Sequence, residues 1–442
     1  MSRFHSRDKT VKRKLIAVLD DLARHPEDHV KDPGRDMTRK RVLSLRTIME
    51  ALIEMEGNSL AKETYNFCRD HSVSFTPSAF VQARAKVLPE TFWQALLMFN
   101  DSCRMYNTAR YRGYRLIAVD GTKICTFLDP DSDTYFRQTG CKGYNQIHVS
   151  ALYDLLNYYY LDAVINSIND YNEPHECFEM FERVDCGKKA ILLADRGYGS
   201  NNLFMHCFRH GLDFVIRVKE NFYTEFKDFD SDTWDIWLDN EYRTTLSWKD
   251  KEDYAAGKAK FVCPYHLSRR KKRNKNWDFE TPARMKIRFL RFKLDNGTYE
   301  TIATSLSETE FTEEDIRYLY KLRWGVEVSF KSLKYALGLS AFHSKKYESI
   351  VQEVFAKLIA YNYCMRILSA TSLSLDIGCK YEYQLNITVS FYLCMDYLKS
   401  VHCKPPDILS VISKYTLPVR PNRSYKRNKG PQSFRPFIYR IS

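Results

Sequence analysis

The alternation of strand-like and helix-like segments between residues 114 and 219 is the feature that most limits how this chain can fold. Four segments are rich in β-branched and aromatic residues, and a helical segment lies between the second and the third. In order they read YRLIAVDGTKI, QIHVSALYDLLNYYYLDAVI, EPHECFEMFERV, AILLADRGYG and LDFVIRVKE. The second is long enough for a hairpin. This order of elements predicts an α/β fold.

Two of the predicted strands end on an aspartate. Asp120 follows LIAV, Asp195 follows ILLA, and a glycine comes within two residues of each. Open α/β folds place their chemistry at the carboxyl ends of the strands, which makes both side chains candidates for a site. Taken singly, an aspartate before glycine is more often a turn or capping residue. The carboxylates Asp154, Asp162 and Glu173 fall outside this pattern.

Helices are predicted on both sides of this segment. In TPSAFVQARAKV, Thr76 can cap a helix and Pro77 suits its first position, with Arg84 and Lys86 expected to face outward. Further along, a hairpin is predicted around the Asn296-Gly297 turn. The C-terminal part has apolar-periodic helices and closes with a basic tail.

The charge of the chain points to a polyanion partner. The net charge is +13 and the pI is about 9.0, and an excess of this sign most often indicates nucleic acid. Two basic runs, Ser268 to Trp277 and Arg420 to Ser442, are candidates for phosphate contacts or are merely solvated charge. The chain has no apolar run of 18 residues, no signal-peptide core and no CxxC pair. A membrane span, secretion and a zinc ribbon are therefore not expected.

The segment YLYKLRWGVEVSFKSLK carries one acid, Glu327, among basic and aromatic residues. On a helical wheel, Tyr320, Arg323, Glu327 and Lys334 share an arc of roughly 60° beside the apolar stripe. A salt bridge between Arg323 and Glu327 is the simpler explanation of the acid, and a place at the edge of the core is the simpler one for Tyr320. The alternative is a phosphate-handling site. There carboxylates bind Mg²⁺ or Mn²⁺, and the basic neighbours orient phosphate.

Three short motifs occur in order along the chain. They are VDGT at Val119 to Thr122, ADRGY at Ala194 to Tyr198, and Y-x2-R-x3-E-x6-K at Tyr320, Arg323, Glu327 and Lys334. Together they resemble the signature of DDE transposases, and more narrowly the bacterial insertion-sequence family four of cut-and-paste type. The likeness extends to SAFVQARAK and LPVRPNRSYKR and covers most of the chain.

The resemblance implies a ribonuclease-H-like catalytic core interrupted by a β-rich insertion, with helical N- and C-terminal regions. It divides the chain into a DNA-end-binding region (1–110), the first part of the core (111–219), the insertion (220–306), the catalytic helix (307–345) and a helical region with a basic tail (346–442). By motif, the catalytic, metal-binding triad would be Asp120, Asp195 and Glu327, holding two Mg²⁺ ions that Mn²⁺ can replace. The DNA-phosphate contacts would be Tyr320, Arg323 and Lys334, supported by Arg196 and Tyr198.

The implied activity is cleavage of transposon ends and their joining to target DNA by two-metal-ion hydrolysis and transesterification, through a hairpin. The expected partners are double-stranded DNA, at terminal inverted repeats and target sites, and a second copy of the chain in a synaptic homodimer. The expected location is the bacterial cytoplasm, with the nucleoid. Two alternatives stay open: a metal-dependent nuclease without strand transfer, and a non-catalytic DNA-binding regulator descended from a transposase.

Overall fold

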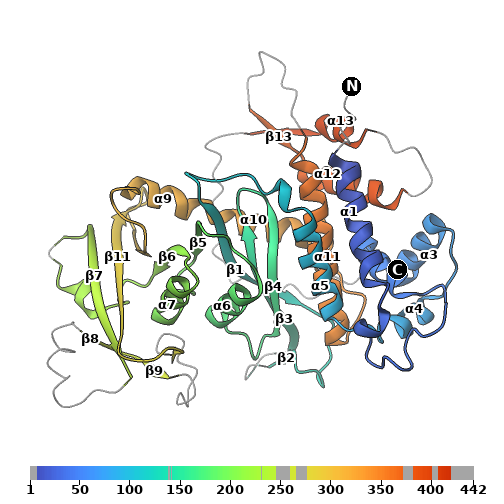
Figure 1. Ribbon diagram of the computed structural model, residues 1–442, viewed down its shortest axis with the longest axis horizontal. Coiled ribbons are helices and arrows are strands. Elements are labelled where there is room, and N and C mark those ends of the chain that lie inside the picture. Colours follow the sequence, from blue (N-terminus) through green and yellow to red (C-terminus); the bar gives the residue numbers. More distant parts are fainter. Residues whose placement is uncertain are drawn as a thin grey trace.

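A mixed β-sheet forms the centre of the computed structural model (Figure 1). The structure describes residues 7–137, 140, 142–229, 231–244, 259–264, 276–371, 382–400 and 407–419. Most of the basic run Ser268 to Trp277 and all of the tail from Arg420 lie outside these residues. The phosphate contacts predicted for these two runs therefore concern residues outside the described part of the chain.

Ten strands of the described part make up this sheet, in the order β2-β3-β1-β5-β6-β12-β11-β7-β8, with β4 also paired to β3. Their bounds are β1 Arg115–Cys125, β2 Tyr135–Phe136, β3 Tyr144–Asp154, β4 Tyr159–Ser167, β5 Ala190–Ala194, β6 Asp213–Val218, β7 Trp234–Arg243, β8 Ala259–Phe261, β11 Ala283–Lys293 and β12 Tyr299–Thr304. Strands β4, β3 and β1 are antiparallel, whereas β1, β5 and β6 are parallel. The mixed α/β class predicted from the order of the elements is confirmed.

Four strands between residues 234 and 304, namely β7, β8, β11 and β12, extend this sheet. β12 pairs with β6, and β11 with β12, both antiparallel. The β11–β12 hairpin predicted at Asn296-Gly297 is present, and Gly297 has a φ of +82°. Outside the large sheet, β9 (Cys263–Pro264) pairs with β10 (Asn276–Trp277), and β13 (Tyr383–Leu385) with β14 (Thr416–Pro418).

Helices cover both faces of the sheet because successive residues of a strand point to opposite sides. In β1, Leu116 and Ala118 belong to one hydrophobic core, and Ile117 and Val119 to another. The second core is closed by α6 (Glu173–Arg183) and α7 (Asn201–Arg209), which contribute Cys177, Phe178, Leu203 and Phe204. Every residue of β5 is buried, as expected for a parallel strand with helices on both faces.

The first core is shared by the N- and C-terminal helices. Its central element is α11 (Tyr347–Leu368), which is buried on almost all sides and packs against helices from both ends of the chain. The other helices of these regions are α1 (Arg7–Leu22), α2 (Leu45–Glu54), α3 (Leu60–His71), α4 (Pro77–Arg84), α5 (Glu90–Ser102), α12 (Ile387–Lys399) and α13 (Ile408–Ser413), with the 3-10 turns η1 (Pro26–His29), η2 (Arg104–Tyr106) and, near the sheet, η3 (Thr224–Lys227). A helix that is buried on almost all sides, as α11 is, is stable only with neighbours all around it.

The prediction that Arg84 faces outward is wrong. Thr76 caps α4 and Pro77 begins it as predicted, but the Arg84 side chain is only 2% exposed. Its guanidinium lies 2.9 Å from Glu353 of α11 and donates to the backbone oxygen of Ser349. The partners lie some 270 residues further along the chain, so local sequence could not reveal them.

Within the described residues, no helix combines the length and the apolar character needed to cross a membrane.

Candidate active site

Asp120 and Asp195 lie side by side on neighbouring parallel strands. Val119 of β1 is in register with Ala194 of β5, and each aspartate is the next residue along its strand direction. The Oδ1 atom of Asp120 accepts from the Gly121 N–H at 2.9 Å, and that of Asp195 accepts from the Gly197 N–H at 2.8 Å. The sheet therefore brings together two acids that are 75 positions apart in the chain.

Asp120 is in the middle of its strand, not at the end as predicted. β1 continues to Cys125 because β3 pairs with it along its whole second half, from Asp120↔Ala151 to Cys125↔Gln146. β5 has no such partner beyond Ala194 and ends there. The side chain of Asp120 therefore projects from β1 at the level where the parallel neighbour β5 ends. Asp120 thus lies beside the end of a parallel strand, although its own strand continues.

The segment around Glu327 consists of two helices where the sequence predicted one. α9 (Glu313–Leu322) ends and α10 (Trp324–Tyr335) begins on either side of Arg323. At this junction the N–H groups of Arg323 and Val326 bond to the oxygen three residues back, a tighter turn than in an α-helix. Gly325 faces Leu155 so closely that a Cβ there would lie 2.8 Å from its Cδ2 atom. α10 therefore packs tightly over the strand layer.

Arg323 connects the glutamate to the first aspartate. Its Nη2 atom lies 2.7 Å from Glu327 Oε1, and its Nη1 atom lies 3.8 Å from Asp120 Oδ2. The predicted Arg323–Glu327 ion pair is present. However, the arginine is only 5% exposed and also faces Asp120, so the pair is not a simple surface bridge.

The three acids are close enough to affect each other. Burial raises the pKa of Asp120 to about 7, with Asp195 and Glu327 adding to the rise, while Arg323 and the Gly121 N–H oppose it. A carboxyl group near two other acids and one arginine is under-neutralised, which is typical of a site that receives an additional cation. Such oxygen donors fit hard divalent ions.

Lys334 reaches the motif that contains Asp120. Its Nζ atom donates to Thr122 Oγ1 at 2.6 Å and to the Lys123 backbone oxygen at 3.1 Å. Burial lowers the pKa of this lysine. The third motif thus contacts the first through both Arg323 and Lys334.

The remaining predicted contacts differ in accessibility. Arg196 is exposed, next to Asp195. Tyr320 is 8% exposed, and the Arg323 guanidinium lies 5.7 Å from its ring centre. Tyr198 is 1% exposed, with its hydroxyl 3.5 Å from Ser150 Oγ. Direct contacts of these residues with DNA stay predictions, and the burial of Tyr198 favours a supporting role within the core.

Sequence analysis gave no role to a buried polar group beside the aspartates. His148 of β3 is in register with Lys123 and is 1% exposed. Burial by itself would lower the pKa of His148, but the neighbouring carboxylates of Glu173 and Glu176 raise it above the ordinary value. The strand pattern QIHVSALYD offered one signal, a histidine among apolar residues, and such a residue is more often an ordinary core histidine.

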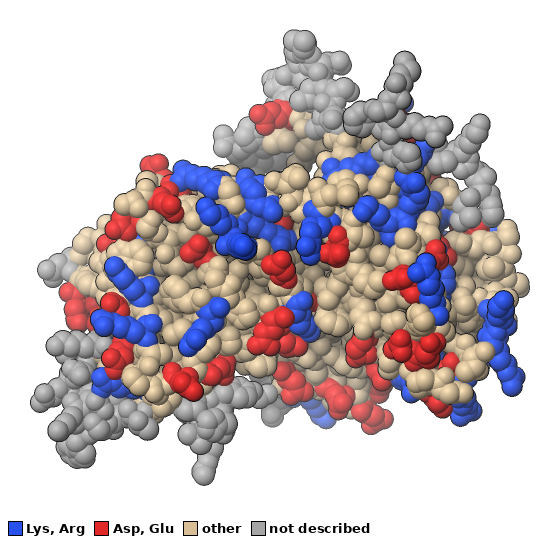
Figure 2. Space-filling model, viewed as in Figure 1, with Lys and Arg blue, Asp and Glu red and all other residues tan. Residues whose placement is uncertain are grey.

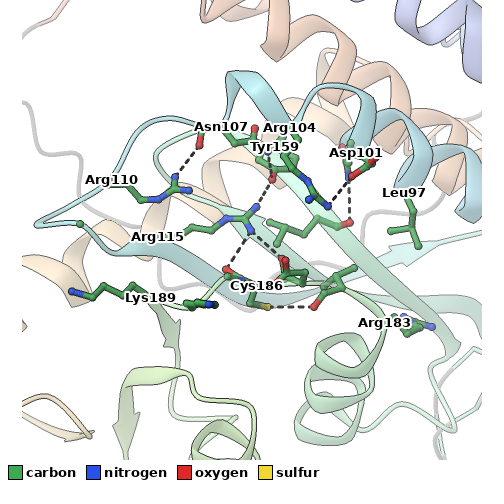
Figure 3. A pocket seen from close by; sticks show the side chains of 17 residues that line it. Leu97, Asp101, Arg104, Asn107, Arg110, Arg115, Tyr159, Arg183, Cys186 and Lys189 are labelled. Atoms are coloured by element: carbon green, nitrogen blue, oxygen red, sulfur yellow. Dashed lines mark hydrogen bonds and ion pairs between the residues drawn. The ribbon is translucent and has the colours of Figure 1, made fainter.

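Two hollows of the described surface lie away from the three acids. One, of about 480 Å³, is at the opposite ends of β1 and β5 and is lined by Arg115, Tyr159, Cys186 and Lys189 (Figure 3). The Arg115 guanidinium in this hollow already has partners, since it donates to Asp154 at 2.7 Å and to the Cys186 backbone oxygen at 3.3 Å. Cavity size therefore does not identify the site.

A second hollow lies in the N-terminal region, next to α4, and has a volume of about 1280 Å³. Basic side chains are prominent in its lining, namely Arg35, Arg39, Lys40, Arg41, Arg46 and Lys86. Figure 2 shows that Lys and Arg side chains also gather over α9 and around α1 and α12, whereas acidic side chains gather along the lower edge of the same face. The excess positive charge is thus unevenly distributed.

Comparison with known proteins gives a family match over more than half of the chain. Residues 111–363 match the family described as the transposase DDE domain. The transposases of insertion sequence elements IS186A (InsL, Escherichia coli strain K12) and IS421 (Escherichia coli) are each 37% identical over 67 residues, which is 15% of this chain and 18% of each relative. A solved piggyBac transposase synaptic complex with hairpin DNA has a TM-score of 0.47 at 9% identity, covering 97% of this chain and 89% of that one.

Proposed function

Because the chain belongs to the transposase DDE domain family, we propose that it cleaves the ends of a transposon and joins them to target DNA. One observation carries this proposal. The parallel register of β1 and β5 and the close packing of α10 bring Asp120, Asp195 and Glu327 of three separate motifs to one place. The relatives above are matched over less than a fifth of their length, so the activity of the whole chain rests on this geometry together with the family.

Asp120, Asp195 and Glu327 would hold the divalent cations, two Mg²⁺ ions or Mn²⁺ in their place. The donor set supports this assignment, because Asp195 and Glu327 are near enough to Asp120 to raise its pKa, and Arg323 lies between Asp120 and Glu327. Bound cations of this kind lower the pKa of water or of a 3′-hydroxyl and stabilise the leaving oxygen of an in-line displacement. Arg323 would keep Asp120 and Glu327 near each other until the cations and DNA arrive.

The basic side chains of the site would position the phosphodiester. Lys334, which lies beside Thr122, and Arg196, which lies beside Asp195, would contact phosphate oxygens. The ring of Tyr320 would support the Arg323 guanidinium by packing near it. In the proposed sequence, a first cleavage frees a 3′-hydroxyl that then attacks a second phosphodiester. The reaction would pass through a hairpin on the element's end, and it would form no covalent protein–DNA intermediate.

The proposal also assigns roles to the regions of the chain. The five-stranded part β4-β3-β1-β5-β6 together with α10 would be the ribonuclease-H-like core, and the strands from β7 to β12 the insertion within it. Residues 1–110 would bind the terminal inverted repeats, which is supported by the basic lining of the hollow beside α4. Joining two ends implies a synaptic homodimer.

The test is cleavage of a labelled duplex made from the DNA that flanks the gene, in Mg²⁺ or in EDTA. Wild-type protein is compared with Glu327→Gln and with Glu313→Gln. Glu313 is a matched control, because it also pairs with an arginine four residues away, Arg317, at 2.5 Å, but on the exposed side of α9. Metal-dependent nicking or hairpins that Glu327→Gln loses and Glu313→Gln retains are the expected result.

Other outcomes separate the alternatives. Cleavage without joined products in the presence of target DNA would leave a nuclease. DNA binding with no metal-dependent cleavage by the wild-type protein, on verified element ends, would contradict the proposal and leave a DNA-binding regulator.

A further inference from the structure

Glu173, the first residue of α6, lies beside the active-site aspartates although no motif includes it. The surroundings of Gly197 show how close Glu173 comes to Asp195. A Cβ atom built at Gly197 would lie 3.0 Å from Asp195 Oδ1 and 3.1 Å from Glu173 Oε2. Both carboxylate oxygens therefore border the same small space.

Gly121, the glycine of the first motif, is also close to Glu173. A Cβ atom built at Gly121 would collide with the imidazole of His148 and would lie 3.0 Å from Glu173 Oε1. Neither Gly121 nor Gly197 has a positive φ that would itself require glycine. Gly121 follows Asp120, and Gly197 lies two residues after Asp195. Because neither glycine has a side chain, there is room for Glu173 and for the histidine that contacts it.

His148 holds one oxygen of Glu173 in place. Its Nε2 atom lies 3.3 Å from Glu173 Oε1, and its Nδ1 atom lies 3.2 Å from Glu176 Oε2. The imidazole is almost fully buried and is stacked on Tyr171 at 4.2 Å. Glu176 is held in turn, since its Oε1 atom accepts from Asn166 Nδ2 at 2.7 Å. This chain of contacts orients Glu173 from the core outward.

A purely structural ion pair would account for Oε1 but not for Oε2. Glu173 keeps 23% of its side chain exposed, so the carboxylate could rotate its free oxygen into solvent. Its Oε2 atom instead borders the space at Gly197 that Asp195 Oδ1 also borders. Two negative oxygens on one small space repel each other unless a cation lies between or beside them. Oriented carboxylates supported by a second layer of hydrogen bonds are typical of metal sites.

We propose that Glu173 is a fourth carboxylate of the active site. Its Oε2 atom binds a hard divalent cation together with Asp195, and His148 holds Oε1 as a positioning residue. This inference rests on the proposed function, because it takes the site of Asp120, Asp195 and Glu327 to be a cation site. It adds a ligand from α6 on the side opposite Glu327's helix.

The test uses full-length protein and Mn²⁺ alone, with free Mn²⁺ measured by electron paramagnetic resonance. We expect Glu173→Gln to weaken Mn²⁺ binding by roughly 10- to 100-fold, and His148→Gln by about 10-fold. Glu179→Gln is the matched control. Glu179 is on the same helix and pairs with Arg183 at 3.2 Å, and 42% of its side chain is exposed. It does not border the space between Glu173 and Asp195 in any contact described above, so we expect wild-type Mn²⁺ affinity.

A second measurement does not depend on the basal stability of the variants. Mn²⁺ should raise the melting temperature of the wild-type protein by mass action, and the same concentration should raise that of Glu173→Gln by less. Wild-type Mn²⁺ affinity and an undiminished melting shift in Glu173→Gln would overturn the inference. If Asp195→Asn still weakens binding in that case, the proposed function stands alone. If Asp195→Asn and Glu327→Gln also bind Mn²⁺ like the wild type, both fail.

Discussion

At two places along β1 an arginine is paired with an aspartate, but the two pairs differ in how completely the hydrogen-bonding capacity of the acid is satisfied. At the start of the strand, Asp154 is 0% exposed and accepts from Arg115 at 2.7 Å and from the Asn157 backbone N–H at 2.9 Å. In the middle of the strand, the Asp120 side chain is 18% exposed, accepts one backbone N–H, and has Arg323 at 3.8 Å.

This difference separates a structural acid from a functional one. The Asn157 side chain also donates to both oxygens of Asp154, at 2.9 and 3.0 Å, so that carboxylate has no capacity left for a ligand. Asp120 retains that capacity and has two other acids nearby. Both acids are in apolar, strand-like sequence, and the number of their partners, not the residue type, distinguishes them.

Replacing the under-satisfied acid should remove activity and leave the fold intact. In Asp120→Asn we expect cleavage of element ends to fall on the order of 10⁴-fold, because a cation ligand is lost. Its melting temperature should hold or rise, since one of three mutually repelling acids is neutralised. Cleavage rates and calorimetry on the same preparation check this. Unfolding of the variant would show that Asp120 is structural, as Asp154 is.

Replacing the satisfied acid should do the opposite. Asp154→Ala leaves Arg115 buried without its carboxylate, and we expect a loss of about 3–5 kcal/mol in the free energy of unfolding. Urea titration followed by tryptophan fluorescence measures it, and the double variant Arg115→Met, Asp154→Leu should recover a large part. A stable Asp154→Ala protein that fails only in cleavage would break the comparison.

The pH dependence of stability should follow the satisfied acids. Arg84 and His343 hold the pKa of buried Glu353 at about 2, against the desolvation that burial imposes. Because the pKa is lower in the folded state, this stabilisation is present above about pH 4.5 and is lost as pH falls toward 2. Between about pH 6 and pH 3 the loss is roughly 2 kcal/mol.

Glu353→Gln checks that assignment. The stability difference between the wild type and the variant, measured by urea titration at each pH, should shrink as the solution is acidified. A difference that stays constant from about pH 6 to pH 3 would show that the pKa of Glu353 is the same in the folded and unfolded states.

The smallest effect concerns DNA affinity. We expect Lys334→Gln to weaken duplex binding by roughly 1 kcal/mol and to reduce the salt dependence by about one phosphate contact. Lys331→Gln, on the same helix with an exposed side chain, is the control and should change both less. Fluorescence anisotropy over a salt series measures the two slopes. Equal slopes in Lys334→Gln and wild type would place Lys334 at Thr122 for structural reasons only.

By itself, the sequence determined the class of fold and the triad of candidate acids. The strand and helix periods of residues 114–219 are local properties of the chain, and so are the caps of α4 and the Asn296-Gly297 turn. The three motifs likewise carry their identity in short spacings. Such features are readable because neighbouring residues alone produce them.

Only the tertiary structure decided which polar groups are satisfied. Arg84 has its partner on α11, Arg323 faces an aspartate on a distant strand, and Glu173 is oriented by a histidine on β3. The close packing of α10 against Leu155 at Gly325 is likewise a contact between residues far apart in the chain. These outcomes depend on contacts between residues far apart in the chain, and whether a buried charge is structural or available for a ligand is settled by those contacts.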